Sequence, residues 1–141
     1  SERREIFHEN EEILSAKIQQ LVKQNITPIF CVGESLEDKR QGTTFQKIEH
    51  QLKAITQFKN EIIIAYEPIW AIGTNEIPKV QEINEIHQFI KNLYSKPQNV
   101  LYGGSVNPLN ASDILSSNQV DGILVGRASL EVALLLALKE S

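Results

Sequence analysis

The sequence is short of several residue types, and each shortage excludes a class of protein. Its 141 residues contain one cysteine, so the chain cannot form an internal disulfide, and a disulfide-rich secreted scaffold is excluded. No apolar run approaches the roughly 20 residues that a membrane-spanning helix needs. The formal net charge of −4 shows no basic excess, which argues against a general nucleic-acid surface or an anionic-membrane surface.

The sequence also contains no methionine, and its start has no targeting pattern. SERREIF, residues 1–7, lacks the apolar core of a signal peptide. We therefore expect the numbered chain to be a piece that begins inside a longer protein of the reducing cytoplasm. Its content of 41% hydrophobic and 23% charged residues is normal for one soluble globular domain.

Strand-like and helix-like segments alternate along the chain. Short apolar runs predict four buried strands, at residues 27–32, 61–66, 99–104 and 122–126. Apolar residues at helical spacing predict helices over residues 11–24, around Ile48 and Leu52, around Ile86 and Ile90, around Ile114, and over residues 129–139.

Three of these helices also carry start signals. Thr43 and Gln46 have the spacing of a capping box. Pro78 suits the first turn of a helix, and Asn110 can cap a short one. These signals predict where the helices after the first, second and third strands begin.

The order of the segments predicts a parallel α/β fold. One helix and then four strand–helix pairs imply parallel strands with right-handed crossovers. Because the strands are continuously apolar, we expect both faces of the sheet to be covered. Four such strands fit an open doubly wound sheet or half of an eight-stranded barrel, which usually takes about 250 residues.

The ends of the predicted strands carry the residues suited to chemistry, because ligands of parallel α/β folds bind there. The glycine turns at residues 103–105 and 126–129 can bring main-chain N–H groups to a ligand, and a helix starting at the second would add partial positive charge. The two turns therefore predict a phosphate cradle. Glycines that merely allow tight turns are the alternative, and it stays open.

Glu67 stands at the end of the second strand and is followed by an unusual loop. Partial loss of water around this carboxylate would favour a role as proton acceptor, whereas a solvated or salt-bridged glutamate is the open alternative. PIWAIGT, residues 68–74, is too apolar for an ordinary exposed loop. It predicts a lid that covers a site for part of the time.

Five motifs, in order and spread over the chain, resemble triosephosphate isomerase. They are SERRE at the start, FCVGE at 30–34, AYEPIWAIGT at 65–74, YGGSV at 102–106 and VGRASL at 125–130. The resemblance implies that residues 1–141 form a single partial domain, the second half of a (β/α)8 TIM barrel with barrel strands five to eight. It implies glycolysis and gluconeogenesis, a cytoplasmic homodimer, a triose phosphate substrate and no metal or other cofactor.

The resemblance also implies a role for particular residues. Glu67 would be the catalytic base that interconverts dihydroxyacetone phosphate and D-glyceraldehyde 3-phosphate through an enediolate, and Glu2 would help order the site from behind. Main-chain N–H groups would bind the substrate phosphate at Gly73, Ser105, Gly126 and Arg127. The lid would comprise Pro68, Ile69, Trp70, Ala71, Ile72 and Thr74, with Glu34 touching Trp70 when it is open and Tyr102 holding it when it is shut.

Two electrophiles of that family, a lysine and a histidine, have no counterpart in these 141 residues. His8, His50 and His87 fall on or near predicted helices, so we interpret them as surface or helix residues, and Cys31 as a buried structural thiol. We therefore expect the chain alone to be inactive. A half-barrel that binds phosphate esters without reacting them, and a structural fragment that pairs with another half, are the alternatives.

The chain also departs from the family pattern at two places. Asn75 and Glu76 follow the lid where the family commonly has glycine and lysine, which puts lid kinetics in question. Arg127 stands where many members have a second glycine. Because only a backbone N–H is needed there, a side chain that points outward would be harmless.

Overall fold

A computed structural model describes residues 2–58, 62–74, 76–94 and 98–139 of the chain. It contains one parallel sheet whose strands are ordered as in the sequence, β1 to β4. The strands are β1 (Ile29–Val32), β2 (Ile63–Tyr66), β3 (Val100–Tyr102) and β4 (Gly122–Ile123). The predicted alternation and parallel pairing are confirmed, and the sheet does not close into a barrel.

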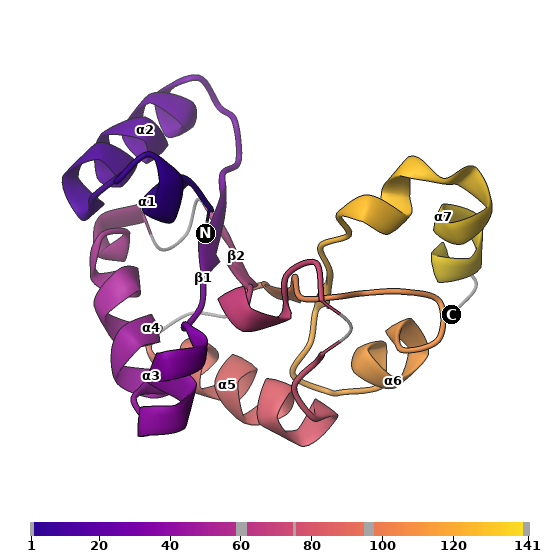
Figure 1. Ribbon diagram of the computed structural model, residues 1–141. Coiled ribbons are helices and arrows are strands. Elements are labelled where there is room, and N and C mark those ends of the chain that lie inside the picture. Colours follow the sequence, from indigo (N-terminus) through magenta and orange to yellow (C-terminus); the bar gives the residue numbers. More distant parts are fainter. Residues whose placement is uncertain (1, 59–61, 75, 95–97, 140–141) are drawn as a thin grey trace.

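The helices follow the strands in an open arc, with the strands on its inner side (Figure 1). The α-helices are α1 (Glu2–Ile6), α2 (Glu11–Lys23), α3 (Leu36–Gln41), α4 (Thr44–Lys53), α5 (Val80–Asn92), α6 (Ala111–Leu115) and α7 (Val132–Lys139). Short 3-10 helices are η1 (Thr56–Phe58), η2 (Ile69–Ala71) and η3 (Arg127–Leu130).

One predicted capping box is wrong, and another lies one helix earlier. Thr43 precedes α4, but its side chain does not cap the helix and instead donates to the carbonyl oxygen of Asp38, at 3.2 Å. Ser35 and Asp38 form a capping box on α3, a short helix that the sequence did not predict. Asp38 thus closes one helix start and accepts from the residue that begins the next, which lets two helices follow β1 with a tight junction.

The other two start signals mark the right regions but act differently. Pro78 lies one residue before Lys79, the N-cap of α5, and so outside the first turn. Asn110 occupies the N-cap position of α6 without capping it. Its amide nitrogen donates to the carbonyl oxygen of Ser105, at 2.9 Å, and its side-chain oxygen accepts from the N–H of Asn107. Asn110 therefore stabilises the turn after β3 rather than the helix.

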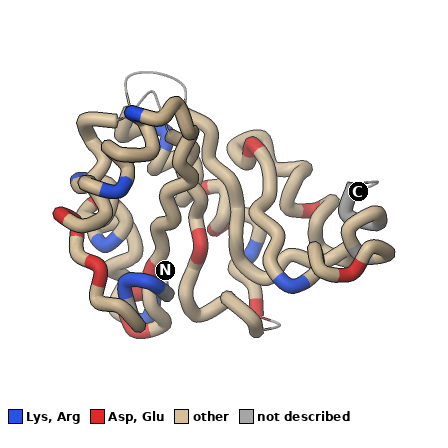
Figure 2. Tube along the Cα trace, turned by 90° about the horizontal axis from the view of Figure 1, so that it is seen from above, with Lys and Arg blue, Asp and Glu red and all other residues tan. Residues whose placement is uncertain are grey.

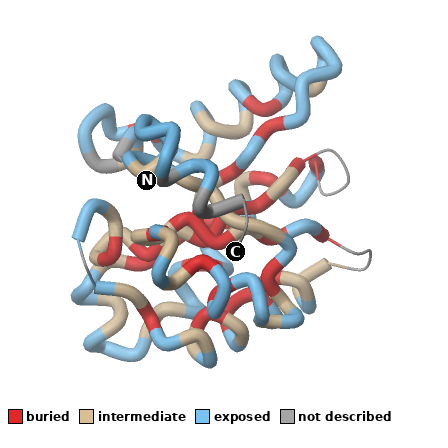
Figure 3. Tube along the Cα trace, turned by 90° about the vertical axis from the view of Figure 1, so that its right-hand side faces the viewer, coloured by how far each residue is buried: buried red, intermediate tan, exposed pale blue. Residues whose placement is uncertain are grey.

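The core lies between the sheet and the helices that cover its outer face, and Figure 3 shows buried residues along the strands and the adjoining helix faces. Phe30 and Ile64 on this face are 5% and 0% exposed. Ile29, on the inner face, is 46% exposed. The expectation that both faces are covered thus fails at Ile29 in the described chain, because the four strands do not close into a barrel.

The carboxyl-terminal part leaves apolar side chains exposed. Leu130, Val132, Leu135 and Leu136, in η3 and α7, are between 45% and 82% exposed. No helix in the described ranges is long and apolar enough to cross a membrane.

Charged residues of both signs are interspersed along the trace (Figure 2). Some pair between elements: the Lys91 ammonium lies 2.9 Å from the Asp121 carboxylate, and Lys39 lies 3.4 Å from Glu82. Ion pairs that are partly exposed in this way contribute little to stability.

His87, in α5, is a buried helix residue. Its Nδ1 lies 3.3 Å from the carbonyl oxygen of Gln119, and its ring packs edge-on against Tyr66 with the centroids 5.9 Å apart. Its Nε2 is buried and has no hydrogen-bond partner among the described residues, so a second proton there would have no acceptor. Burial, the largest cause, lowers the pKa of His87 to about 4.

We predict that the free energy of unfolding falls as the pH is lowered from about 6.5 to about 4. The unfolded chain takes up a proton on this histidine near its ordinary pKa, whereas the folded chain does so only near 4. Stability present above pH 6.5 is therefore lost on acidification, by about 3 kcal/mol at most. Urea unfolding at a series of pH values across this window measures the loss.

The matched variants are His87→Gln and His50→Gln. The His50 side chain is 67% exposed, so its replacement should leave the acid sensitivity unchanged. His87→Gln should flatten the pH dependence. An equally steep curve for His87→Gln would show that other groups cause the acid loss.

Candidate functional site

The register of the sheet places Glu67 between two glycines. Val32 pairs with Tyr66, and Tyr66 pairs with Tyr102, so the next residues along the three strands are Gly33, Glu67 and Gly103. The ladder continues one step further: the N–H of Glu67 donates to the carbonyl oxygen of Val32 at 2.7 Å, and that of Gly103 to Tyr66 at 2.8 Å. Side chains alternate along a strand, so Glu67 faces inward, on the same side as Ala65.

Both glycines are needed because Glu67 occupies the space beside them. A Cβ on Gly33 would lie 1.8 Å from the carbonyl oxygen of Glu67. A Cβ on Gly103 would lie 2.6 Å from the Glu67 Cγ and 3.0 Å from its Oε1. These two glycines therefore make room for the glutamate, a requirement that the sequence pattern does not reveal.

Gln51, from α4, holds the first of these glycines. Its side-chain oxygen accepts from the N–H of Gly33 at 2.9 Å, and its nitrogen donates to the carbonyl oxygen of Gly33 at 3.0 Å. Gln51 is buried beside Ile48 and Leu52. Gln51 was not among the residues predicted from the sequence, and the available signal was a glutamine on the apolar face of an amphipathic helix.

The Cys31 thiol lies against Glu67 and donates a hydrogen bond to it. Burial, followed by the negative charge of Glu67 and this hydrogen bond, raises the pKa of Cys31 to about 12. The side chain is partly buried and protonated, which agrees with the expectation of a structural thiol. The pKa of Cys31 therefore depends on the position of the Glu67 carboxylate.

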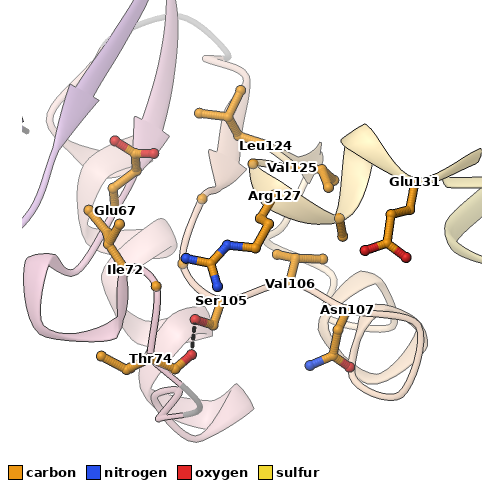
Figure 4. A pocket seen from close by; sticks show the side chains of 15 residues that line it. Glu67, Ile72, Thr74, Ser105, Val106, Asn107, Leu124, Val125, Arg127 and Glu131 are labelled. Carbon is orange, nitrogen blue, oxygen red and sulfur yellow. Dashed lines mark hydrogen bonds between the residues drawn. The ribbon is translucent and has the colours of Figure 1, made fainter. Parts of the chain in front are cut away.

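The predicted strand-end residues share one cavity of about 510 Å³. Its lining includes residues from the ends of β2, β3 and β4 and from the lid, namely Glu67, Ile72, Gly73, Thr74, Ser105, Gly126 and Arg127. Figure 4 shows Glu67 and Ile72 on one side of this cavity and Val106, Asn107 and Glu131 on the other. The structure thus brings the predicted base and the predicted phosphate cradle together, while their roles remain predictions.

The lid is anchored through its tryptophan. The Trp70 indole nitrogen donates to Glu34 Oε1 at 2.7 Å, and the Tyr66 hydroxyl donates to the same oxygen at 3.2 Å. The Lys39 ammonium lies 3.9 Å from the centre of the Trp70 ring. Burial raises the pKa of Glu34 although these hydrogen bonds oppose the shift. The predicted contact between Glu34 and Trp70 is present.

Ser105 holds the lid from the opposite side of the cavity. Its hydroxyl lies 2.6 Å from the carbonyl oxygen of Ala71 and also contacts that of Thr74 (Figure 4). Gly73, between these two residues, has φ of 68°, a left-handed backbone that favours glycine. Pro68 and Ala71 are buried, whereas Gly73 and Thr74 are exposed. The amino end of the lid is thus buried, and its exposed tip is held by the Ser105 hydroxyl.

Tyr102 is part of the core rather than of the cavity lining, and it does not hold the lid in this structure. Its side chain is buried, and its hydroxyl has no hydrogen-bond partner among the described residues. A Cβ on Gly104 would lie 2.1 Å from that hydroxyl oxygen. Gly104 therefore makes room for Tyr102, as Gly103 does for Glu67.

The turn after β4 lacks the expected long helix, and it directs a side chain into the cavity. Gly126 is followed by η3, a 3-10 helix of four residues, so no long helix starts there and its dipole contributes little. The side chain of Arg127 does not point away from the site: it lines the cavity and extends toward Ser105 (Figure 4).

Two further predictions concern groups outside the described residues. The Glu2 side chain and Asn75 lie outside the described residues, while Glu76 is exposed beyond the lid. Within the described ranges, no group of three or more histidine, cysteine, aspartate or glutamate side chains is arranged to hold a metal ion.

The chain is similar to triosephosphate isomerases along its whole length. The family model of that description matches residues 1–141. The triosephosphate isomerase of Aquifex aeolicus is 43% identical over 142 residues, which cover 93% of this chain and 58% of that protein. The one from Mycoplasma mobile is 45% identical over 136 residues, covering 94% of this chain and 56% of that protein. The chain therefore spans a little over half the length of these curated relatives.

We predict that Glu67→Gln makes the Cys31 thiol more reactive. The substitution removes the negative charge that helps to raise the pKa of Cys31, so the thiolate fraction at a given pH increases. We expect alkylation near pH 8.5 to be about threefold to tenfold faster. Because Cys31 is the sole cysteine, mass spectrometry of the intact chain after timed iodoacetamide treatment measures it.

The control is Glu49→Gln, which removes an equal charge from the exposed surface of α4. It should leave the alkylation rate unchanged. Equal rates for Glu67→Gln and the unsubstituted chain would mean that the carboxylate does not face Cys31 in solution.

Proposed function

The chain belongs to the triosephosphate isomerase family, and from that premise we propose that it carries the proton-transferring and phosphate-binding side of an active site that interconverts dihydroxyacetone phosphate and D-glyceraldehyde 3-phosphate. The observation that carries this proposal is the shared cavity of about 510 Å³ in which Glu67 meets the two turns after β3 and β4. One small molecule in this cavity can place a reacting carbon next to the carboxylate and an anionic group at the two turns.

Glu67 is proposed as the base. The proton next to a carbonyl group is weakly acidic, so its removal needs a carboxylate that is held in place and largely free of competing water. The glycines on the two strands beside Glu67 leave space for the carboxylate because they have no side chains. Gln51 fixes the position of Gly33. The Cys31 hydrogen bond further restricts its orientation.

The phosphate is proposed to bind to main-chain N–H groups at Gly73, Ser105, Gly126 and Arg127. These residues line the same cavity and come from the lid and from two strand ends. A lid formed by residues 68–74 would exclude water from the enediolate and prevent loss of phosphate from it. The Trp70 contact with Glu34 and the Ser105 contact with the lid backbone are the interactions that such closure would rearrange.

The electrophile that stabilises the enediolate is proposed to come from elsewhere. Among the described residues that line the cavity, none is lysine or histidine. Stabilising a developing oxyanion is usually a large part of such catalysis. We propose that the lysine and histidine of the family complete the site, with Glu2 ordering it, in a cytoplasmic homodimer that acts in glycolysis and gluconeogenesis. We further propose that residues 1–141 form one partial barrel domain.

We predict that Glu67→Gln lowers isomerase turnover by about 10²–10⁴-fold in the protein expressed from its native coding sequence. The amide keeps the shape of the side chain but cannot accept the substrate proton. A coupled assay with dihydroxyacetone phosphate measures the rate.

Glu49→Gln again serves as the control and should retain full turnover. A Glu67→Gln protein with more than a tenth of the original rate would overturn the assignment of the base. Binding of glycerol 3-phosphate to both variants separates a lost proton transfer from a lost site.

We predict that a polypeptide of residues 1–141 alone shows no measurable turnover in the same assay. It contains the proposed base and phosphate turns, but no lysine or histidine lines the described cavity. Circular dichroism and the fluorescence of the single tryptophan, Trp70, establish whether the polypeptide is folded.

Turnover near that of the relatives would contradict this prediction. Binding of glycerol 3-phosphate without reaction would agree with it. If the protein from the native coding sequence also bound glycerol 3-phosphate without turning over triose phosphate, the alternative function would be favoured, a phosphate-binding half-barrel without catalysis.

A further inference from the structure

The cationic side chain in the cavity lining has no part in the function proposed so far. Arg127 is the sole lysine or arginine among the described residues that line the cavity. Figure 4 shows its guanidinium extending from the start of η3 toward Ser105. The side chain is exposed, so a ligand in the cavity can reach it without rearrangement of the core.

No acidic side chain neutralises this guanidinium in the described part of the chain. The ion pairs found there do not include Arg127. Glu131 lines the same cavity, but in Figure 4 its carboxylate lies away from the guanidinium, across Val106. The positive charge is therefore available to an anion in the cavity.

The turns alone offer that anion little charge. η3 has four residues, and the turn after β3 carries no charged residue between Gly103 and Asn107, so neither supplies more than the partial charges of peptide N–H groups. A phosphate monoester carries up to two negative charges at neutral pH. A guanidinium matches it with a planar pair of donors and a full charge.

We propose that the Arg127 side chain binds the phosphate group of the substrate directly and makes the cavity selective for the dianionic form of phosphate esters. This inference rests on the proposed function, because it concerns the ligand of the same cavity. It assigns to the side chain of Arg127 a role that the main-chain N–H group of the same residue cannot perform. The charge that attracts the dianion resides on the side chain.

The test compares four forms of the protein expressed from its native coding sequence: unsubstituted, Arg127→Gln, Arg127→Lys and Arg40→Gln. Arg40 is exposed on α3, outside the cavity, and its substitution changes the net charge by the same amount. The probe is glycerol 3-phosphate, a phosphate ester without a carbonyl group to isomerise. Isothermal titration calorimetry near pH 7.5 and near pH 5 gives the dissociation constant for the mostly dianionic and mostly monoanionic ester.

We expect Arg127→Gln to weaken binding near pH 7.5 by about tenfold, the effect typical of one charge-assisted hydrogen-bonded contact. Arg127→Lys should lose less, since it keeps the charge without the planar fork. Arg40→Gln should bind within about twofold of the unsubstituted protein. The preference for the dianion, read as the ratio of the two dissociation constants, should shrink in Arg127→Gln alone.

Three negative outcomes are distinct. If the unsubstituted protein binds the ester and isomerises triose phosphate, but Arg127→Gln binds as tightly and with the same pH ratio, only the role of Arg127 is overturned. If the unsubstituted protein binds no phosphate ester, the proposed function falls and the role of Arg127 with it. Equal weakening by Arg40→Gln would attribute the effect to net charge and also overturn the inference.

Discussion

The site depends on the register of three strands. With Tyr66 paired to Val32 on one side and Tyr102 on the other, Glu67 falls between Gly33 and Gly103 and faces the inner side of the sheet. A slip by one residue would turn the carboxylate toward the helices, because successive side chains of a strand point to opposite faces. It would also place a tyrosine beside the glutamate, where a single Cβ already has no room.

The residues after β1 connect this register to the lid. Gln51 holds both main-chain polar groups of Gly33, and the next residue, Glu34, accepts the hydrogen bond of Trp70. The Glu34 carbonyl oxygen also accepts from the N–H of Ile69, at 3.0 Å. A shift of this turn would therefore move the neighbour of Glu67 and the anchor of the lid together. Position of the base and position of the lid are set by one short piece of chain.

The inner face and the end of the chain present apolar surface for which the described residues offer no cover. Ile29, on β1, is 46% exposed, and Leu135 and Leu136, on α7, are 45% and 56% exposed. The edges of the sheet, β1 and β4, also have unpaired main-chain groups, which favour the addition of further strands. We propose that the closure of a barrel in the longer arrangement typical of the family buries these surfaces and supplies the electrophiles.

The sequence alone determined the order of the strands, the parallel sheet and the residues at the strand ends, because apolar periodicity and glycine position are local properties of the chain. It also identified Glu67 and the lid from one continuous stretch. Only the tertiary structure decided what each turn is for. Gly33 and Gly103 leave space for Glu67, Asn110 holds a turn instead of a helix, Gln51 fixes a glycine 18 residues earlier, and Arg127 lies in the cavity. The physical reason is that side-chain direction and close contact depend on neighbours brought together by folding, which no local pattern records.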